Sequence, residues 1–110
     1  MRRFSMAFAL ALAPIAAAAA TLSPSTIVAG ASSYDGKTVT VTGKVSNFQT
    51  SSTMMGTVAG FQLCDSKCVV VIDQTNHART NGSTATVTGT FHTTFKGPRK
   101  TFNNAVVIGR

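Results

Sequence analysis

The sequence predicts an all-β domain in which five short strands close into a small barrel. Two stretches, 38–45 and 84–91, carry the main evidence, because each alternates apolar and polar residues and each holds one Gly at the same internal step. A Gly inside a strand marks a bulge or a sharp bend, which allows a short sheet to curl. Two such strands, near the start and the end of a short chain, therefore suggest a sheet that closes on itself.

Residues 1–20 have the pattern of an export signal. Arg2 and Arg3 form a basic start, residues 6–12 form an apolar core, and the alanines at 16–20 offer small-residue cleavage sites. The apolar run is shorter than the roughly 20 residues that a membrane-spanning helix needs. We therefore expect a cleaved signal peptide over 1–20, a single domain over 21–110, a periplasmic or secreted location, and no membrane span after cleavage.

The predicted domain begins with a short helix. Ser23 can cap this helix and Pro24 suits its first position, so residues 22–30 are expected to be helical. Ile27 and Val28 would then face the core.

The remaining elements are predicted from alternation and from turn residues. In the first strand the valines are expected inside and the threonines outside. The polar stretch 46–56 is interpreted as a flexible connection, and 74–82, which ends in an Asn-Gly pair, as a turn region with room for one helical turn. We expect turns at 34–37 and 65–67, strands at 38–45, 57–64, 68–73, 83–91 and 102–108, and a Gly-Pro loop at 92–101.

Five strands with this spacing favour the OB-fold, a five-stranded Greek-key barrel, over a two-sheet sandwich, which usually needs about seven strands. The run Tyr-Asp-Gly-Lys-Thr-Val-Thr-Val-Thr-Gly-Lys-Val at 34–45 resembles the entry to strand one of small anticodon-binding-type OB domains. Phe-Gln-Leu-Cys-Asp at 61–65 and Val-Thr-Gly-Thr-Phe at 87–91 are similar to their strands two and four. With its leader, the chain resembles exported bacterial OB-fold proteins over 34–108, which implies a small binding domain without catalytic residues.

Cys64 and Cys68 flank the predicted turn at 65–67 and would lie opposite each other across it. Opposed residues have Cα atoms about 4.5–5.5 Å apart, within the range of about 4.4–6.8 Å that disulfides accept, and export provides an oxidising compartment. A structural disulfide that fixes the hairpin register is the favoured interpretation. Two alternatives remain: a soft-metal site that also uses Met54 and a histidine, and a redox-active pair.

The 92–101 loop carries the candidate ligand-binding residues, Phe95, Lys96, Arg99 and Lys100. In an OB-fold this loop flanks the usual ligand groove. Cations follow phosphates while aromatic faces stack on bases, so this composition suits a single nucleic-acid strand. The alternative is a solvated hairpin tip whose lysines prevent edge pairing.

The charge balance favours a binding protein over an enzyme. Without Arg2 and Arg3, eight basic residues face three Asp and no Glu, which leaves a net charge of +5 and favours anionic partners. No Ser or Cys has a nearby His in sequence to activate it, so we expect neither catalysis nor a cofactor. Weak binding of single-stranded nucleic acid or another anionic polymer is the first function predicted. Recognition of an envelope protein, through a strand edge or the threonine face, and transport of a soft metal are the alternatives.

Four further side chains have expected positions. Met54 and Met55 are interpreted as a flexible apolar lid over the mouth of the barrel. Phe61 is expected to point inward because of the alternation of its strand, and His77 and His92 are expected to be exposed.

Overall fold

A computed structural model of the chain describes residues 20–54, 56–97 and 100–109. The predicted signal peptide lies outside these residues, apart from its last position. Within the described ranges, no helix combines the length and the apolar character that a membrane crossing requires.

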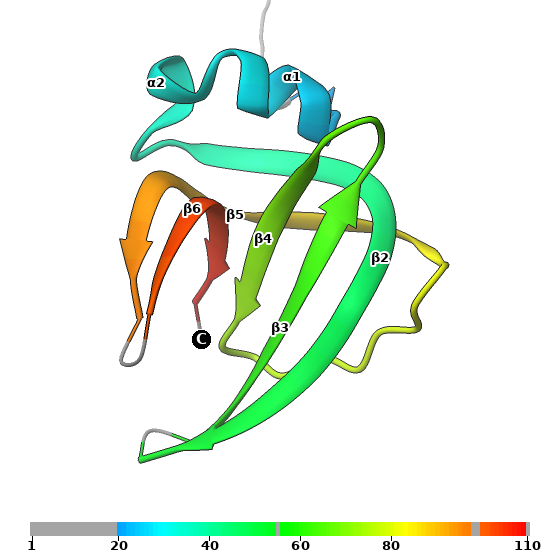
Figure 1. Cartoon of the computed structure of the whole chain (residues 1–110), viewed down its shortest axis with the longest axis vertical. Coiled ribbons are helices and arrows are strands. Elements are labelled where there is room, and N and C mark those ends of the chain that lie inside the picture. The colour runs from blue at the N-terminus through cyan, green and yellow to red at the C-terminus, as the bar shows by residue number, and fades with distance from the viewer. Residues whose placement is uncertain (1–19, 55, 98–99, 110) are drawn as a thin grey trace, which may run out of the picture.

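Two short helices precede the main strands. α1 spans Pro24–Ala29, and the Ser23 hydroxyl caps it by accepting a hydrogen bond from the Thr26 N–H at 3.2 Å. This confirms the predicted helix, and Ile27 from α1 is fully buried, as expected. α2, Ala31–Tyr34, follows directly and was not predicted. Both helices lie over one end of the sheet (Figure 1).

Most of the described chain is strand, which confirms the all-β class. A two-residue strand, β1, adds to the five that were predicted. The strands are β1 (Thr21–Leu22), β2 (Thr38–Thr53), β3 (Gly56–Cys64), β4 (Cys68–Asp73), β5 (Thr84–Lys96) and β6 (Thr101–Ile108).

The strands form one sheet in the order β1-β2-β3-β4-β6-β5, and an additional pairing between β2 and β5 joins its two sides. The first half of β2 pairs with β5 and the second half with β3, so β2 curves around the molecule (Figure 1). β4 and β6 run parallel, whereas β3 is antiparallel to both of its neighbours. The sheet thus closes on itself through β2, β3, β4, β6 and β5.

The two threonine-rich segments lie side by side, as the repeat predicted. They are antiparallel, and their hydroxyl groups meet on the outer face of the sheet. The Oγ1 atoms of Thr40 and Thr88 are 2.9 Å apart, and those of Thr42 and Thr86 are 2.6 Å apart. These cross-strand pairs join the two ends of the closed sheet.

The two repeated glycines lie where their strands change partner. The residue that follows Gly43 pairs with both β5 and β3, and the residue that follows Gly89 pairs with both β2 and β6. A Cβ atom at Gly43 would lie 3.1 Å from the backbone N and O of Cys64, and one at Gly89 would lie 2.5 Å from the Val107 carbonyl oxygen. Neighbouring backbone therefore occupies the space that a side chain would need at either position.

The core fills the inside of the closed sheet beneath α1. It confirms that Phe61 points inward and that the valines of β2 are buried. The buried cluster consists of Ile27, Val39, Val41, Val45, Phe61, Leu63, Val69, Val71, Ala85, Val87, Phe91 and Val106.

Two segments predicted as loops are largely strand. β2 continues to Thr53 and β5 continues to Lys96, so the predicted connection at 46–56 and the predicted loop at 92–101 are wrong over these residues. Both extensions contain threonine, which has a high β-propensity, and pairing with β3 and β6 satisfies the backbone groups on one edge of each. A bulge between Ser46 and Gln49 allows β2 to stay paired with β3.

The polar region 74–83 holds no helical turn in the described structure. Its end instead runs beside β2, where the Gly82 N–H donates to the Val45 carbonyl at 2.8 Å and the Val45 N–H donates to the Ser83 carbonyl at 2.9 Å. The Asn81 Oδ1 atom accepts a hydrogen bond from the Phe48 N–H at 3.0 Å. These three bonds fix 81–83 beside β2, and the turn predicted at the Asn-Gly pair is present, since the Ser83 N–H donates to the Thr80 carbonyl at 3.1 Å and Gly82 has a φ of 87°.

Candidate binding surface

The hairpin formed by β5 and β6 carries the predicted ligand-binding residues. Phe95 lies directly opposite Phe102, and Lys96 lies opposite Thr101. The Gly97 N–H donates to the Lys100 carbonyl at 2.9 Å, which closes the hairpin. Both phenylalanines are half-buried and both lysines are exposed.

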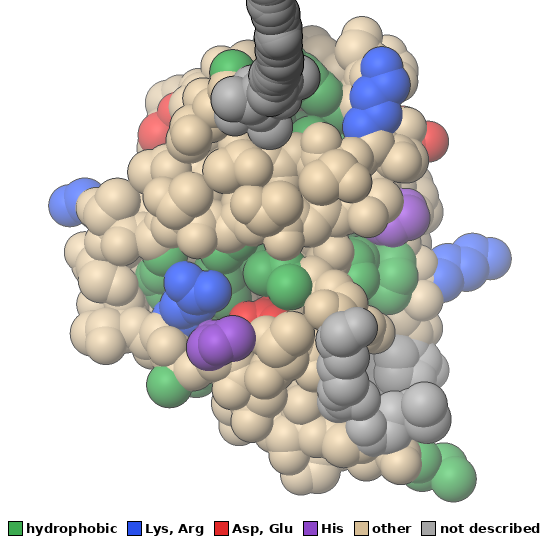
Figure 2. All heavy atoms as spheres, turned by 180° about the vertical axis from the view of Figure 1, so that it is seen from behind, with side chains coloured by type: hydrophobic (Ala, Val, Ile, Leu, Met, Phe, Trp, Pro, Cys, Tyr) green, Lys and Arg blue, Asp and Glu red, His purple; other side chains and the backbone are tan. Residues whose placement is uncertain are grey.

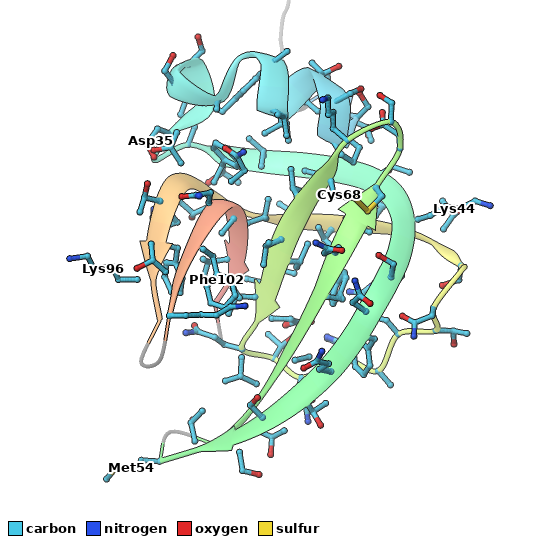
Figure 3. The ribbon with its side chains drawn as sticks, in the orientation of Figure 1. Asp35, Lys44, Met54, Cys68, Lys96 and Phe102 are labelled. Atoms are coloured by element: carbon cyan, nitrogen blue, oxygen red, sulfur yellow. A yellow bond between two sulfur atoms is a disulfide. The ribbon has the colours of Figure 1, made fainter. Side chains whose placement is uncertain are left out.

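One lysine and one histidine of this hairpin contact its phenylalanine rings. The Lys100 Nζ atom lies 5.0 Å from the centre of the Phe102 ring, a cation–π distance. The His92 ring packs against Phe95 with 5.7 Å between centres, which explains why His92 is half-buried where exposure was predicted. Lys96 points outward from the hairpin, away from the rest of the molecule (Figure 3).

Three of the four predicted binding residues thus come together on one hairpin: Phe95, Lys96 and Lys100. The fourth, Arg99, lies outside the described residues. Among the described residues, neither lysine forms an ion pair, so both charges face solvent. The base of the hairpin is fixed by Asp35, whose Oδ1 atom accepts a hydrogen bond from the Thr93 N–H at 2.9 Å.

The two cysteines form the expected disulfide. Cys64 pairs with Cys68 across the β3–β4 hairpin, with Cα atoms 4.1 Å apart and the sulfur atoms bonded. The neighbouring pairs, Leu63 with Val69 and Phe61 with Val71, also have the predicted register. The disulfide therefore closes a hairpin whose register is already specified by the alternation of apolar and polar residues in β3 and β4.

Asp65, inside the disulfide loop, ties this turn to α1. Its Oδ1 atom accepts hydrogen bonds from the Lys67 N–H at 3.0 Å and the Ser25 N–H at 3.1 Å, and its Oδ2 atom accepts one from the Ser25 hydroxyl at 2.7 Å. The pKa of the Asp65 carboxyl is lowered, first by the bond from Lys67 and then by the hydroxyl of Ser25. The charged carboxylate is the form that these donors favour.

The residues of the soft-metal alternative do not form a common metal site in this fold. Both cysteines are in the disulfide and offer no thiolate. Met54 lies at the far tip of the β2–β3 hairpin, at the opposite end of that hairpin from Cys68 (Figure 3). Met54 is fully exposed and projects away from the body of the protein, so its interpretation as a lid is wrong. Met55 lies outside the described residues.

A polar cluster at the end of β4 was not predicted. Asp73 is fully buried, and its Oδ1 atom accepts hydrogen bonds from the N–H and the hydroxyl of Thr75. Because the Thr75 hydroxyl donates to Asp73, it accepts from the Nδ1 of His77, 2.8 Å away. His77 itself is exposed, as predicted. The inward-outward alternation along β4 that buries Val71 also places Asp73 inside. This alternation was the sequence signal from which the burial of Asp73 could have been predicted.

Next to this cluster, an aromatic stack covers the end of the core. The Arg79 guanidinium lies 5.6 Å from the centre of the Phe61 ring, and the Phe48 ring is 6.0 Å from Phe61. Viewed from behind, the protein has a hollow in which hydrophobic side chains are visible beside basic, acidic and histidine side chains (Figure 2). Among the described residues, no group of three or more His, Cys, Asp or Glu side chains could hold a metal ion.

The comparisons with known proteins return no relative. No family model, no curated protein and no solved structure matches the chain. The function must therefore be inferred from the residues and their arrangement.

Proposed function

We propose that this chain is an exported, non-catalytic OB-fold module that binds single-stranded nucleic acid or another anionic polymer weakly through its β5–β6 hairpin. Support for the OB-fold comes from the strand order, the additional β2–β5 pairing and the parallel β4–β6 pair, which together match a five-stranded Greek-key barrel. The OB-fold is one of the architectures that hold single strands, but fold alone does not assign a ligand.

One observation carries the functional proposal. The hairpin holds two half-buried phenylalanines as a direct cross-strand pair, exposed Lys96 follows Phe95 directly, and the Nζ atom of exposed Lys100 lies 5.0 Å from the centre of the Phe102 ring. Aromatic faces contribute about 1–3 kcal/mol per stacked base, and cations neutralise phosphates beside them. The excess of basic over acidic residues attracts the same class of ligand.

The expected affinity is low and depends on salt. If Lys96, Arg99 and Lys100 each contact one phosphate, the slope of log affinity against log salt is about −2 for a single strand. Affinity should then fall about 20-fold between roughly 50 and 200 mM salt. An uncharged ligand would show no such dependence.

Fluorescence anisotropy with a labelled oligothymidylate tests this proposal. The variant with Lys96 and Lys100 both changed to Ala should lose about two thirds of the salt slope, because two of three phosphate contacts are removed. Lys44→Ala is the matched control, since Lys44 is also an exposed lysine on a strand but lies on the other side of the molecule (Figure 3). Equal affinity at the two salt concentrations, or equal effects of the hairpin and control variants, would refute the proposal.

A further inference from the structure

Residues 74–83 cross the end of the closed sheet that lies away from α1. α1 is tied to the turn that precedes β4, whereas Asp73 is the last residue of β4, so Asp73 lies at the opposite end of that strand. Backbone hydrogen bonds fix the crossing segment at both ends, from Gln74 to β6 at 2.9 Å and from Gly82 to β2 at 2.8 Å. The segment between these bonds therefore spans the end of the sheet.

Two buried polar atoms at this end of the sheet have no partner. Among the side chains that the structure describes, the Oδ2 atom of Asp73 and the Nε atom of Arg79 are buried without a hydrogen bond. Asp73 is 0% exposed, and Thr75 satisfies only its Oδ1 atom. Burial of an unpaired carboxylate oxygen or N–H group costs free energy, and the large majority of such atoms in native proteins have a partner. These two atoms therefore point to bonds that the chain alone does not make.

Both charged groups lie beside the ring of Phe61. Phe61 pairs with Val71, and Asp73 is the next inward residue of β4, so Asp73 and Phe61 are diagonal neighbours on the inner face. The Arg79 guanidinium lies 5.6 Å from the centre of the Phe61 ring, and the half-buried Phe48 ring is 6.0 Å from it. Within the described ranges, Arg79 is in no ion pair. Figure 2 shows a hollow in which basic, acidic and histidine side chains lie beside hydrophobic ones, the combination that this cluster provides.

We propose that this hollow binds a free α-amino acid with an apolar side chain. The Oδ2 atom of Asp73 accepts from the ammonium group, and the guanidinium of Arg79 donates to the carboxylate, for which its planar donors are suited. The ring of Phe48 offers an apolar surface to the side chain of the ligand. A ligand with only one of the two charges would leave the opposite partner unpaired, so the site favours a zwitterion. This inference concerns a second site and goes beyond the ligand binding proposed for the β5–β6 hairpin.

The side chain of His77 controls access to the buried oxygen. Its Nδ1 atom lies 3.9 Å from the Oδ2 atom of Asp73, beyond hydrogen-bond distance, and 2.8 Å from the Thr75 hydroxyl. The His77 side chain is 71% exposed, so few contacts hold the ring in this position. A rotation of the ring away from Thr75 costs one exposed hydrogen bond and opens Oδ2 to an entering ammonium group.

Titration of the oxidised full chain with L-leucine, followed by proton–nitrogen nuclear magnetic resonance, tests this site. The Nε–H signal of Arg79 and the amide signal of Thr75 should shift together and saturate, with a Kd of about 1 mM or tighter. Isopentylamine, which lacks the carboxylate of leucine, and isocaproate, which lacks its amine, should each bind about tenfold more weakly or worse. An analogue that binds as tightly as leucine, or the absence of any shift up to about 10 mM leucine, would overturn the proposal.

Two substitutions assign the contacts with the ligand. Arg79→Gln should weaken leucine binding about tenfold or more, because it removes the positive charge that faces the carboxylate. Asp73→Asn should have an effect of the same size, while its amide oxygen can still accept the bonds that Thr75 donates to Asp73. Arg79 is only half-buried, so its variant keeps the test decisive even where Asp73→Asn does not fold.

Two controls separate this site from the rest of the chain. Lys67→Gln also removes one positive charge, but at the exposed turn beyond the opposite end of β4, and it should bind leucine within about twofold of the wild type. The variant with Lys96 and Lys100 both changed to Ala should also bind leucine normally, so failure of this proposal and failure of the hairpin proposal are seen separately. If Arg79→Gln binds leucine as tightly as Lys67→Gln, the hollow is not the site.

Discussion

Replacement of Gly89 by Ala is the sharpest test of how the sheet closes. An added Cβ atom would lie 2.5 Å from the Val107 carbonyl oxygen, 2.9 Å from the Val107 carbonyl carbon and 3.0 Å from Cγ1 of Val106. The first two atoms belong to the backbone of β6, which pairs with β5 at this point. The new methyl group therefore has to push one strand away from the other.

The cost can be estimated from these contacts. Overpacking of a tight site costs about 1–3 kcal/mol, and displacement of the β6 backbone would weaken a ladder hydrogen bond worth about 1 kcal/mol more. We expect Gly89→Ala to lower the free energy of unfolding by about 3 kcal/mol, which for a domain of this size corresponds to a fall in Tm of about 12–24 °C. Gly89 does not have a positive φ, so the expected loss of stability comes from steric overlap alone and not from backbone strain.

Gly60→Ala is the matched control. Gly60 also lies inside a strand, but a Cβ atom there would meet only the Val71 carbonyl oxygen, at an ordinary 3.9 Å. This change should be neutral or stabilise the protein by up to about 1 kcal/mol, since Ala restricts the unfolded chain. Urea and thermal unfolding followed by circular dichroism measure both variants. If Gly89→Ala and Gly60→Ala differ by less than about 0.5 kcal/mol, the close approach of β5 and β6 is wrong.

Three further predictions concern the disulfide turn, its contact with α1 and the threonine pairs. Asp65→Asn should remove the stability that the lowered pKa of Asp65 provides. The wild type should exceed this variant in free energy of unfolding most at pH values above the ordinary pKa of 3.8, and the difference should vanish as the pH falls through the lower pKa of the folded protein. Unfolding at several acidic pH values measures this difference. Replacing Cys64 and Cys68 by Ser should cost about 2 kcal/mol in urea unfolding, because the closed loop is short, and a loss of all structure would contradict this limited role. Thr42→Val should cost between about 0.2 and 1 kcal/mol by thermal unfolding through its lost hydroxyl bond to Thr86, and a larger loss would mean that this pair does more than align the strands.

The parts of the fold that could be predicted are those in which hydrophobic alternation and turn spacing act together. The three residues 65–67 between Cys64 and Cys68 leave one register for the β3–β4 hairpin, because a shift by one residue would turn Phe61 outward. The closure between the two threonine segments was predicted for the same reason, since a Gly at equal positions in both marks the bends.

The lengths of the strands could not be predicted in this way. The end of β2 and the end of β5 are polar or mixed, so burial leaves no periodic signal there, and only pairing with β3 and β6 makes them strands. The alternation of β4 indicates that Asp73 is buried, but its contacts with Thr75 and His77 depend on how the chain turns after β4, which single-sequence patterns do not encode. Phe95, Lys96 and Lys100 could be grouped from the sequence because they lie close together in the chain, and their role in binding stays a prediction.

Closure of the sheet also determines where the β2–β3 and β5–β6 hairpins lie. β2 and β5 each use one half of their length to pair with each other, which joins the two sides of the sheet. Their other halves then pair outward with β3 and β6 and end as hairpins (Figure 1). One hairpin carries exposed lysines beside phenylalanines, and the other carries no charge. Because the β5–β6 hairpin begins where β5 changes partner after Gly89, a substitution that loosens this bend should weaken the proposed ligand binding at that hairpin.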